Sequence, residues 1–145
     1  MTDLIRVLLG MMAPSERIPI SGIDFFDKNL NDSQKEAIQF CLESPEVACI
    51  HGPPGTGKTH TLIELIRQMT TKSAYNPKPL RLLVCGASNL SVDNILERLL
   101  SLPSAPKGQE LRVTRVGHPA RVMSRASILE ATLEVQSARS DQVWL

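Results

Sequence analysis

The glycine-rich stretch HGPPGTGKTH at residues 51–60 limits what this chain can fold into more than any other feature. Gly52, Gly57, Lys58 and Thr59 fit the pattern G-x-x-x-x-G-K-[ST], in which glycines let backbone N–H groups turn toward a polyphosphate. An apolar run precedes the stretch, and a segment with helical periodicity follows it. Because a phosphate-binding loop requires this order, the stretch predicts a nucleotide site rather than a Gly/Pro turn with a chance lysine.

The predicted ligands of this loop are ATP and Mg²⁺. Lys58 would reach the β- and γ-phosphates and the Thr59 hydroxyl would ligate Mg²⁺, so both are predicted catalytic residues. The following helix would add unpaired N–H groups and the positive end of its dipole. The cofactor-binding residues predicted within the loop are Gly52, Pro53, Pro54, Gly55, Thr56, Gly57, Lys58, Thr59 and His60.

Composition places the chain among soluble globular proteins. Its 145 residues are 42% hydrophobic and 21% charged, with a formal net charge of +1. The net charge is therefore too small to produce an overall positive potential that would attract nucleic acid, although residues 107–125 carry a local basic bias. Cys41, Cys49 and Cys85 fall in apolar segments without metal-ligand spacing. This usage predicts reduced, buried thiols in a cytosolic or nuclear protein, with neither a disulfide nor zinc.

The N-terminal stretch MTDLIRVLLGMMAP is apolar but fits neither a signal peptide nor a membrane span. Asp3 precedes the apolar run, Arg6 interrupts it, and about 20 apolar residues are needed to cross a bilayer. We expect a short amphipathic helix or linker here, and no membrane partner.

Strands and helices are predicted to alternate along the rest of the chain. Helices are expected at residues 30–42, 58–71 and 91–102, where apolar residues recur with helical spacing. Apolar runs at residues 47–50, 80–85 and 111–116 are predicted to be buried strands. The alternation predicts an α/β fold with a parallel sheet, helices on both faces and right-handed crossovers.

Three further segments narrow the family: LNDSQKEAI at 30–38, CGASNLSVDNILERL at 85–99 and RVGHPAR at 115–121. With the loop they resemble the first RecA-like motor domain of superfamily 1 helicases in the Upf-like branch, closest to the immunoglobulin-mu-binding-protein and DNA polymerase alpha-associated helicase type. The resemblance covers residues 25 to about 141. It implies a P-loop NTPase with an incomplete RecA-like sheet, an N-terminal linker at 1–24 and a partial motor domain at 25–145. It also implies an ATP-dependent helicase that moves 5′-to-3′ on single strands.

The resemblance gives Gln34 the role of reading the adenine of ATP. A side-chain amide suits this task because it can donate to a ring nitrogen while accepting from the exocyclic amine. Asn31 and Gln34 also match a capping box, so the alternative is that Gln34 only completes a helix cap.

The resemblance also assigns contacts with the backbone of single-stranded DNA or RNA. Ser88, Asn89 and Asn94 inherit them in the second segment, and Arg115, His118 and Arg121 in the third. Short polar side chains suit phosphate contacts that do not read bases. The alternatives are a helix cap at Asn89 or Ser91, a satisfied polar His118, and a solvated helix face for Arg121 with Arg125.

The second segment departs from its family in one place. Relatives usually carry Ala-Pro-Ser-Asn where this chain has Gly86, Ala87, Ser88 and Asn89, so a looser turn is expected.

ATP hydrolysis also needs an aspartate for Mg²⁺, a carboxylate that orients water and a charge-neutralising arginine. We find no later apolar strand that would carry the acidic pair, since Glu130 and Glu134 stand at helical spacing. The chain is therefore expected to be a fragment that binds ATP without turnover. The resemblance implies that the full-length motor is monomeric and acts in the nucleus or cytoplasm. The alternatives are a small-molecule kinase and a nucleotide-binding protein without enzymatic activity.

Overall fold

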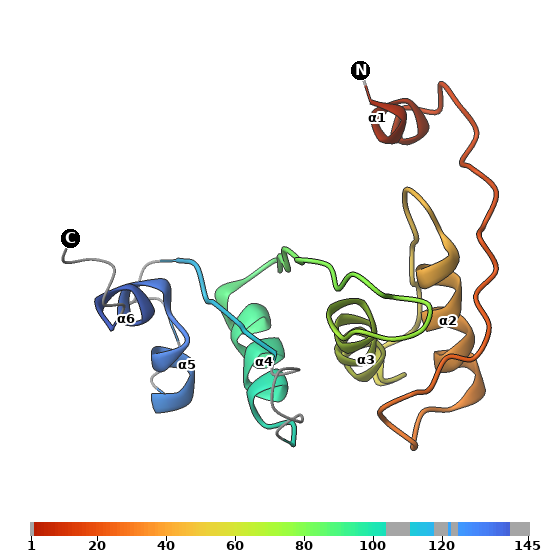
Figure 1. The fold of residues 1–145 in the computed structure, drawn as a ribbon. Coiled ribbons are helices and arrows are strands. Elements are labelled where there is room, and N and C mark those ends of the chain that lie inside the picture. Colours follow the sequence, from red (N-terminus) through yellow and green to blue (C-terminus); the bar gives the residue numbers. More distant parts are fainter. Residues whose placement is uncertain (1, 104–110, 118–121, 123–124, 140–145) are drawn as a thin grey trace. The chain divides into compact units, whose positions relative to one another are not determined.

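A computed structural model describes residues 2–103, 111–117, 122 and 125–139, and the chain divides into two compact units. The first unit is Met1–Leu80 and the second is Arg81–Leu145. The described residues form the helices α1 Asp3–Leu8, α2 Asp32–Glu43, α3 Lys58–Thr70, α4 Asn89–Leu100, α5 Ala126–Glu130 and α6 Leu133–Ala138 (Figure 1). The domain boundary predicted after residue 24 lies inside the first unit and stays a prediction.

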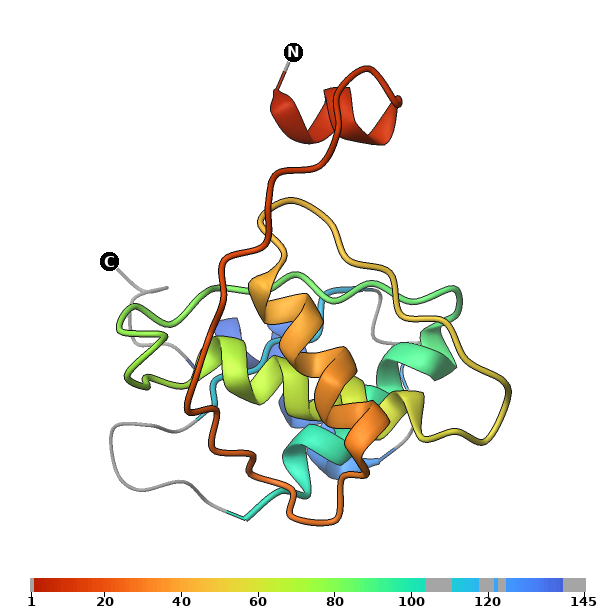
Figure 2. The same ribbon diagram turned by 90° about the vertical axis from the view of Figure 1, so that its right-hand side faces the viewer.

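Helices α2 and α3 form the body of the first unit and lie against each other in both views (Figure 1, Figure 2). Ile38 of α2 is completely buried, and Ile63 and Ile66 of α3 are almost completely buried. Helix α2 ends at Glu43 because Pro45 disfavours the helical conformation in the residue before it, and Ser44 is accordingly extended. The helices predicted at 30–42 and 58–71 are thus confirmed.

Helix α1 confirms the short helix expected near the N-terminus. None of its residues is buried, and Leu4, Ile5 and Leu8 leave much of their surface exposed. No helix in the described part of the chain combines the length and the apolar character needed to cross a membrane.

The second unit packs α4 against α5, and α5 against α6. Its core consists of Leu96 from α4, Ile128 from α5, and Val122 and Ala131 beside them. Helix α4 corresponds to the helix predicted at 91–102, but it begins two residues earlier because Ser88 provides the N-cap. Glu130 and Glu134, which were expected at helical spacing, lie on the separate helices α5 and α6.

The predicted parallel α/β sheet is wrong for the described residues, which form helices and connecting segments and no β-strand (Figure 1). The segments 47–50, 80–85 and 111–116, predicted as buried strands, have no ladder partner there. The nearest approach to a sheet is an isolated parallel bridge between Arg115 and Thr132. It consists of the bonds from Arg115 N–H to the Ala131 carbonyl at 2.7 Å and from Leu133 N–H to the Arg115 carbonyl at 3.0 Å.

The physical reason is that an apolar run indicates burial only when another element covers it. A strand exists through hydrogen bonds to a neighbouring strand, and the run itself does not specify that neighbour. Here the apolar side chains of these segments remain largely outside, with Leu83 87% exposed and Leu80 52% exposed. The predicted RecA-like sheet with helices on both faces is corrected to a helical arrangement in each unit.

The thiols are also less buried than predicted. Cys49 and Cys85 are exposed, and Cys41 is half-buried on α2. Burial raises the pKa of the Cys41 thiol, and the nearby Cys49 adds a smaller effect in the same direction.

Candidate functional site

The phosphate-loop pattern leads directly into the N-terminus of α3. Gly57 is the N-cap of this helix and has left-handed torsion angles, φ 80° and ψ 21°. Gly55, two residues earlier, also has a positive φ of 81°. Residues with a Cβ rarely adopt this conformation, so both turns depend on glycine.

Gly57 is required for a second reason, which is close packing. A Cβ at this position would lie 2.4 Å from Nε2 of Gln34, closer than real contacts allow. The nearest ring atom of His60, Nδ1, would lie 4.0 Å from the same Cβ. The glycine therefore lets Gln34, from a different helix, come up against the loop.

The side chains of the loop turn back onto its own backbone. Nζ of Lys58 donates hydrogen bonds to the carbonyls of Gly52 and Pro53, both at 2.7 Å. The Thr56 hydroxyl donates to the Pro53 carbonyl at 2.9 Å. Lys58 thus begins α3 with its ammonium group over the loop, and Thr59 follows it in the first helical turn.

Gln34 completes the helix cap that the sequence offered as the alternative role, and it also contacts the phosphate loop. Its backbone N–H donates to Oδ1 of Asn31 at 2.9 Å, and its Oε1 accepts from the Asn31 N–H at 3.0 Å. This is the predicted capping box of α2, which is confirmed. Its Nε2 also donates to the Thr56 carbonyl at 3.2 Å, so the same amide joins α2 to the phosphate loop. The adenine-reading role itself stays a prediction.

Sequence reasoning missed Glu64, a buried carboxylate on α3 that is only 1% exposed. It accepts hydrogen bonds from the backbone N–H groups of Phe26 at 2.9 Å and Asp27 at 3.1 Å. Gln68, one turn further along α3, donates to Glu64 at 2.7 Å and to the Asp24 carbonyl at 2.9 Å. Helix α3 therefore holds the segment that leads into the N-cap of α2.

The hydrogen bonds that join Glu64 and Gln68 to the segment 24–27 act as a clamp between α3 and that segment. The sequence contains a signal for this clamp, but it is weak. Thr61, Glu64 and Gln68 recur at helical spacing and are all buried, so a polar stripe of α3 faces inward. The pattern does not reveal the partner, which lies 37 residues before Glu64 in the case of Asp27. The Arg67 guanidinium lies over the Phe26 ring, 4.1 Å from its centroid, on the same segment.

In the second unit, the predicted nucleic-acid residues Ser88 and Asn89 stand at the start of α4. The Ser88 hydroxyl accepts from the Ser91 N–H at 3.1 Å, and the Ser91 hydroxyl accepts from the Ser88 N–H at 3.3 Å. Ser88 therefore caps α4, rather than Asn89 or Ser91 as the alternative supposed. Asn94 lies on the exposed face of the same helix.

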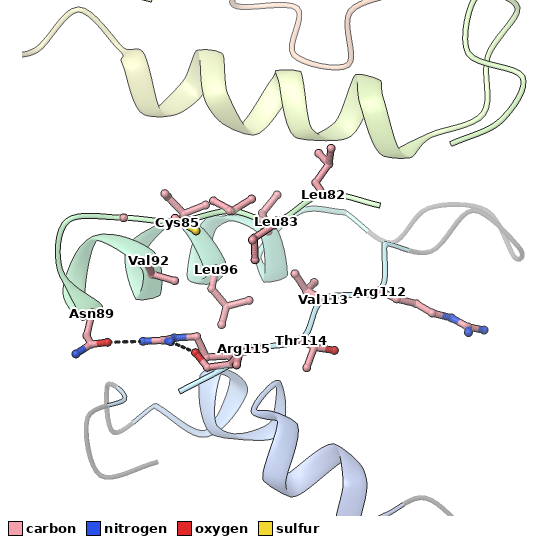
Figure 3. A pocket seen from close by; sticks show the side chains of 15 residues that line it. Leu82, Leu83, Cys85, Asn89, Val92, Leu96, Arg112, Val113, Thr114 and Arg115 are labelled. Atoms are coloured by element: carbon pink, nitrogen blue, oxygen red, sulfur yellow. Dashed lines mark hydrogen bonds between the residues drawn. The ribbon is translucent and has the colours of Figure 1, made fainter. Parts of the chain in front are cut away.

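The turn before α4, expected to be loose, packs closely against the helix. A Cβ on Gly86 would lie 2.4 Å from Oγ of Ser91 and 2.9 Å from Cγ2 of Val92. A cavity of about 410 Å³ lies between the apolar side of α4 and the extended segments 82–86 and 112–116 (Figure 3).

Arg115, predicted to face a nucleic-acid backbone, is 8% exposed and forms an ion pair with Asp93 of α4. Its Nε lies 2.8 Å from Oδ1 of Asp93, and its Nη2 donates to Oδ1 of Asn89 at 3.0 Å (Figure 3). The structure thus brings Arg115 and Asn89 together. His118 and Arg121 lie outside the described residues, and Arg125 forms an ion pair with Glu97 of α4.

Comparison with known sequences gives a consistent result. Residues 29–143 match the family described as an AAA domain. DNA polymerase alpha-associated DNA helicase A of Schizosaccharomyces pombe is 47% identical over 122 residues, which is 84% of this chain and 16% of that protein. DNA-binding protein SMUBP-2 of Rattus norvegicus is 41% identical over 144 residues, 99% of this chain and 13% of that protein.

An uncharacterized ATP-dependent helicase of Methanocaldococcus jannaschii is 39% identical over 120 residues, covering 82% of this chain. The chain spans 13 to 17% of the length of these three relatives. Their names confirm the resemblance that the loop and the three further segments predicted.

Proposed function

The chain belongs to the AAA domain family, and from this premise we propose that it is the ATP-binding part of an ATP-dependent nucleic-acid helicase. The observation that carries the proposal is the glycine loop that ends in the left-handed Gly57 and opens α3 with Lys58 and Thr59. Such a loop presents backbone N–H groups and a helix N-terminus to an anion, while the lysine supplies positive charge.

The residues of the loop fit ATP with Mg²⁺. Lys58 already lies over the loop, bonded to two loop carbonyls, so its ammonium group is available to exchange them for phosphate oxygens. Thr59 would hold Mg²⁺ through its hydroxyl, a hard oxygen ligand of the kind this ion prefers. When bound, the ion would neutralise phosphate charge and polarise the phosphoryl group.

Gln34 is proposed to read the adenine base. We expect Gln34→Ala to weaken the binding of ATP about tenfold and that of GTP much less, because a guanine base does not offer the same donor and acceptor pair. Isothermal titration with both nucleotides measures the difference.

Asn31→Ala provides the matched control, since it removes the other half of the capping box and leaves the Gln34 amide in place. Asn31→Ala should lower the stability of the chain by about 1 kcal/mol and change the affinities for ATP and GTP by the same factor. If Gln34→Ala weakens the binding of ATP and GTP equally, Gln34 does not read the base.

The second unit is proposed to contact the backbone of a single strand through Ser88, Asn89 and Asn94, near the N-terminus of α4. Backbone N–H groups and short polar side chains at such a terminus suit phosphate oxygens. The name of the Rattus norvegicus relative describes it as DNA-binding, which supports DNA as the partner. His118 and Arg121 remain proposed contacts of the same strand.

We further propose that the whole protein moves 5′-to-3′ as a monomer. The name of the Schizosaccharomyces pombe relative associates it with a DNA polymerase, and this supports a nuclear location.

For the 145-residue polypeptide we expect Mg²⁺-dependent ATP binding, weak binding of oligothymidylate, and phosphate release near the background rate. Hydrolysis needs a carboxylate that orients water, and the acidic residue of the loop helix, Glu64, is bonded instead to Phe26 and Asp27. Titrations with and without oligothymidylate at several salt concentrations, together with a phosphate-release assay, test these expectations.

A contact with phosphates should weaken steeply as salt rises. ATP binding that does not need Mg²⁺, or oligothymidylate binding that is insensitive to salt, would contradict the proposal. Transfer of phosphate to a small acceptor would instead identify a kinase.

A further inference from the structure

We infer that Arg115 is a positioning residue, which turns the Asn89 side chain so that its amide nitrogen, and not its oxygen, is offered to a single strand. The inference rests on the proposed role of Asn89 as a backbone contact. It gives Arg115 a different task from the direct phosphate contact that the sequence predicted.

The first support is that the guanidinium is already occupied inside the protein. Its Nε donates to Asp93 at 2.8 Å, its Nη2 donates to Asn89 at 3.0 Å, and its Nη1 donates to the carbonyl of Val116. Asp93 is 2% exposed, so removing its cation would leave a buried carboxylate without this partner. The ion pair therefore holds Arg115 in place beneath the start of α4.

The backbone around Arg115 is shaped to admit the guanidinium. Gly117 has a φ of 142°, and a Cβ there would lie 2.8 Å from Nη1 of Arg115. With a larger residue at 117, the guanidinium or the backbone would have to shift. Gly117 therefore leaves room for the position in which Asp93 holds the guanidinium.

The second support is the chemistry of the Arg115–Asn89 contact. A guanidinium has only donors, so it can accept nothing from the Asn89 amide and must face its oxygen. Figure 3 shows Oδ1 of Asn89 turned toward Arg115 and the amide nitrogen turned away from it. Asn89 is exposed, as the first residue of α4, and its amide nitrogen, which bonds to no group among the described residues, carries two donors.

A phosphate oxygen needs a donor, because phosphate oxygens accept hydrogen bonds and do not donate them. Without Arg115 the Asn89 amide could rotate and present its oxygen, which would repel the same phosphate. Arg115 therefore acts on the strand through Asn89.

A double-mutant cycle on the full 145-residue chain tests this inference. Oligothymidylate binding is measured by fluorescence anisotropy at low salt for Asn89→Ala, Arg115→Gln and the double variant. We expect each single substitution to weaken binding about three- to tenfold, the range for the loss of one typical, solvent-accessible hydrogen bond. The double variant should bind no more weakly than Asn89→Ala, because Arg115 acts only through Asn89.

The dependence on salt separates positioning from direct contact. Each phosphate that a protein cation neutralises contributes about 0.7 to the slope of log affinity against log salt for single strands. Arg115→Gln should leave this slope unchanged. Additive effects in the cycle would overturn the inference. So would a salt slope that Arg115→Gln lowers by about 0.7, the value for one phosphate, both in the unmodified chain and in the Asn89→Ala variant.

Two more variants keep the result interpretable if Arg115→Gln loses helical structure by circular dichroism. Arg115→Lys keeps a cation for Asp93 but lacks the fork that reaches Asn89, so it should weaken binding, whereas a direct phosphate contact would survive. Asn89→Asp keeps an acceptor for Arg115 but presents oxygen and negative charge, and it should bind more weakly than Asn89→Ala. Retained affinity in either variant overturns the inference.

Failure of the proposed function has a different signature. If the unmodified chain shows no salt-dependent binding of oligothymidylate, both the proposed nucleic-acid contact and this inference fail. Binding by the unmodified chain with additive effects in the cycle refutes only the positioning role.

Discussion

Replacing Lys58 by alanine is expected to reduce the affinity for ATP by about 100-fold while leaving the helical content of the chain unchanged. The ammonium group would lose its contacts with the β- and γ-phosphates, and hydrogen bonds to charged groups contribute about 1.5 to 3 kcal/mol each. Lys58 is exposed and fills no core volume, so the fold does not depend on it. Isothermal titration and circular dichroism measure the two quantities.

Lys72→Ala is the matched control for this experiment. Lys72 is also exposed, but it follows the end of the 13-residue helix α3, about 20 Å from the loop by the rise of an α-helix. It should leave ATP affinity within a factor of two. Equal affinity in the Lys58→Ala variant and the unmodified chain would remove the loop from the nucleotide site.

Replacing Glu64 by alanine should have the largest effect on stability, about 3 kcal/mol. The substitution leaves the N–H groups of Phe26 and Asp27 and the amide of Gln68 without the acceptor that they share. Each buried donor then carries a desolvation cost, and the segment before α2 is released from α3. Thermal unfolding followed by circular dichroism should show a midpoint lower by roughly 10 °C.

Glu64→Gln should be intermediate, because its amide oxygen can accept from one N–H while its NH₂ group faces another donor. Glu36→Ala, at an exposed position on α2, is the control and should change stability by less than about 0.5 kcal/mol. If Glu64→Ala and Glu36→Ala unfold at the same temperature, the clamp does not hold the first unit together.

The features that could be predicted from the sequence are those determined by neighbouring residues. The capping box of Asn31 and Gln34 spans three residues, and the start of α3 follows from Gly57 and Lys58. Both depend on backbone torsion and on hydrogen bonds within one helical turn, which a short pattern specifies. The family could be recognised for the same reason, since its motifs are short and closely spaced.

The features that could not be predicted depend on distant partners. The apolar runs gave no information about what would cover them, and the predicted sheet is wrong because they lack neighbouring strands in the described residues. The pairing of Arg115 with Asp93 joins positions 22 residues apart, and an arginine in a motif gives no sign of whether it is buried. Glutamate is a good helix former and is common on exposed helix faces, so the residue type at position 64 does not predict that this side chain is buried.

The carbonyls of Gly52 and Pro53 accept hydrogen bonds from Lys58, so they compete with a bound anion for its ammonium group. The ammonium group has three donors and uses two of them here, so an anion that accepts more than one hydrogen bond from Lys58 must displace a carbonyl. An anion with one weak charge gains little over two carbonyl dipoles, whereas a triphosphate offers several charged oxygens at once. The two Lys58–carbonyl bonds are therefore expected to favour a triphosphate over small, weakly charged anions.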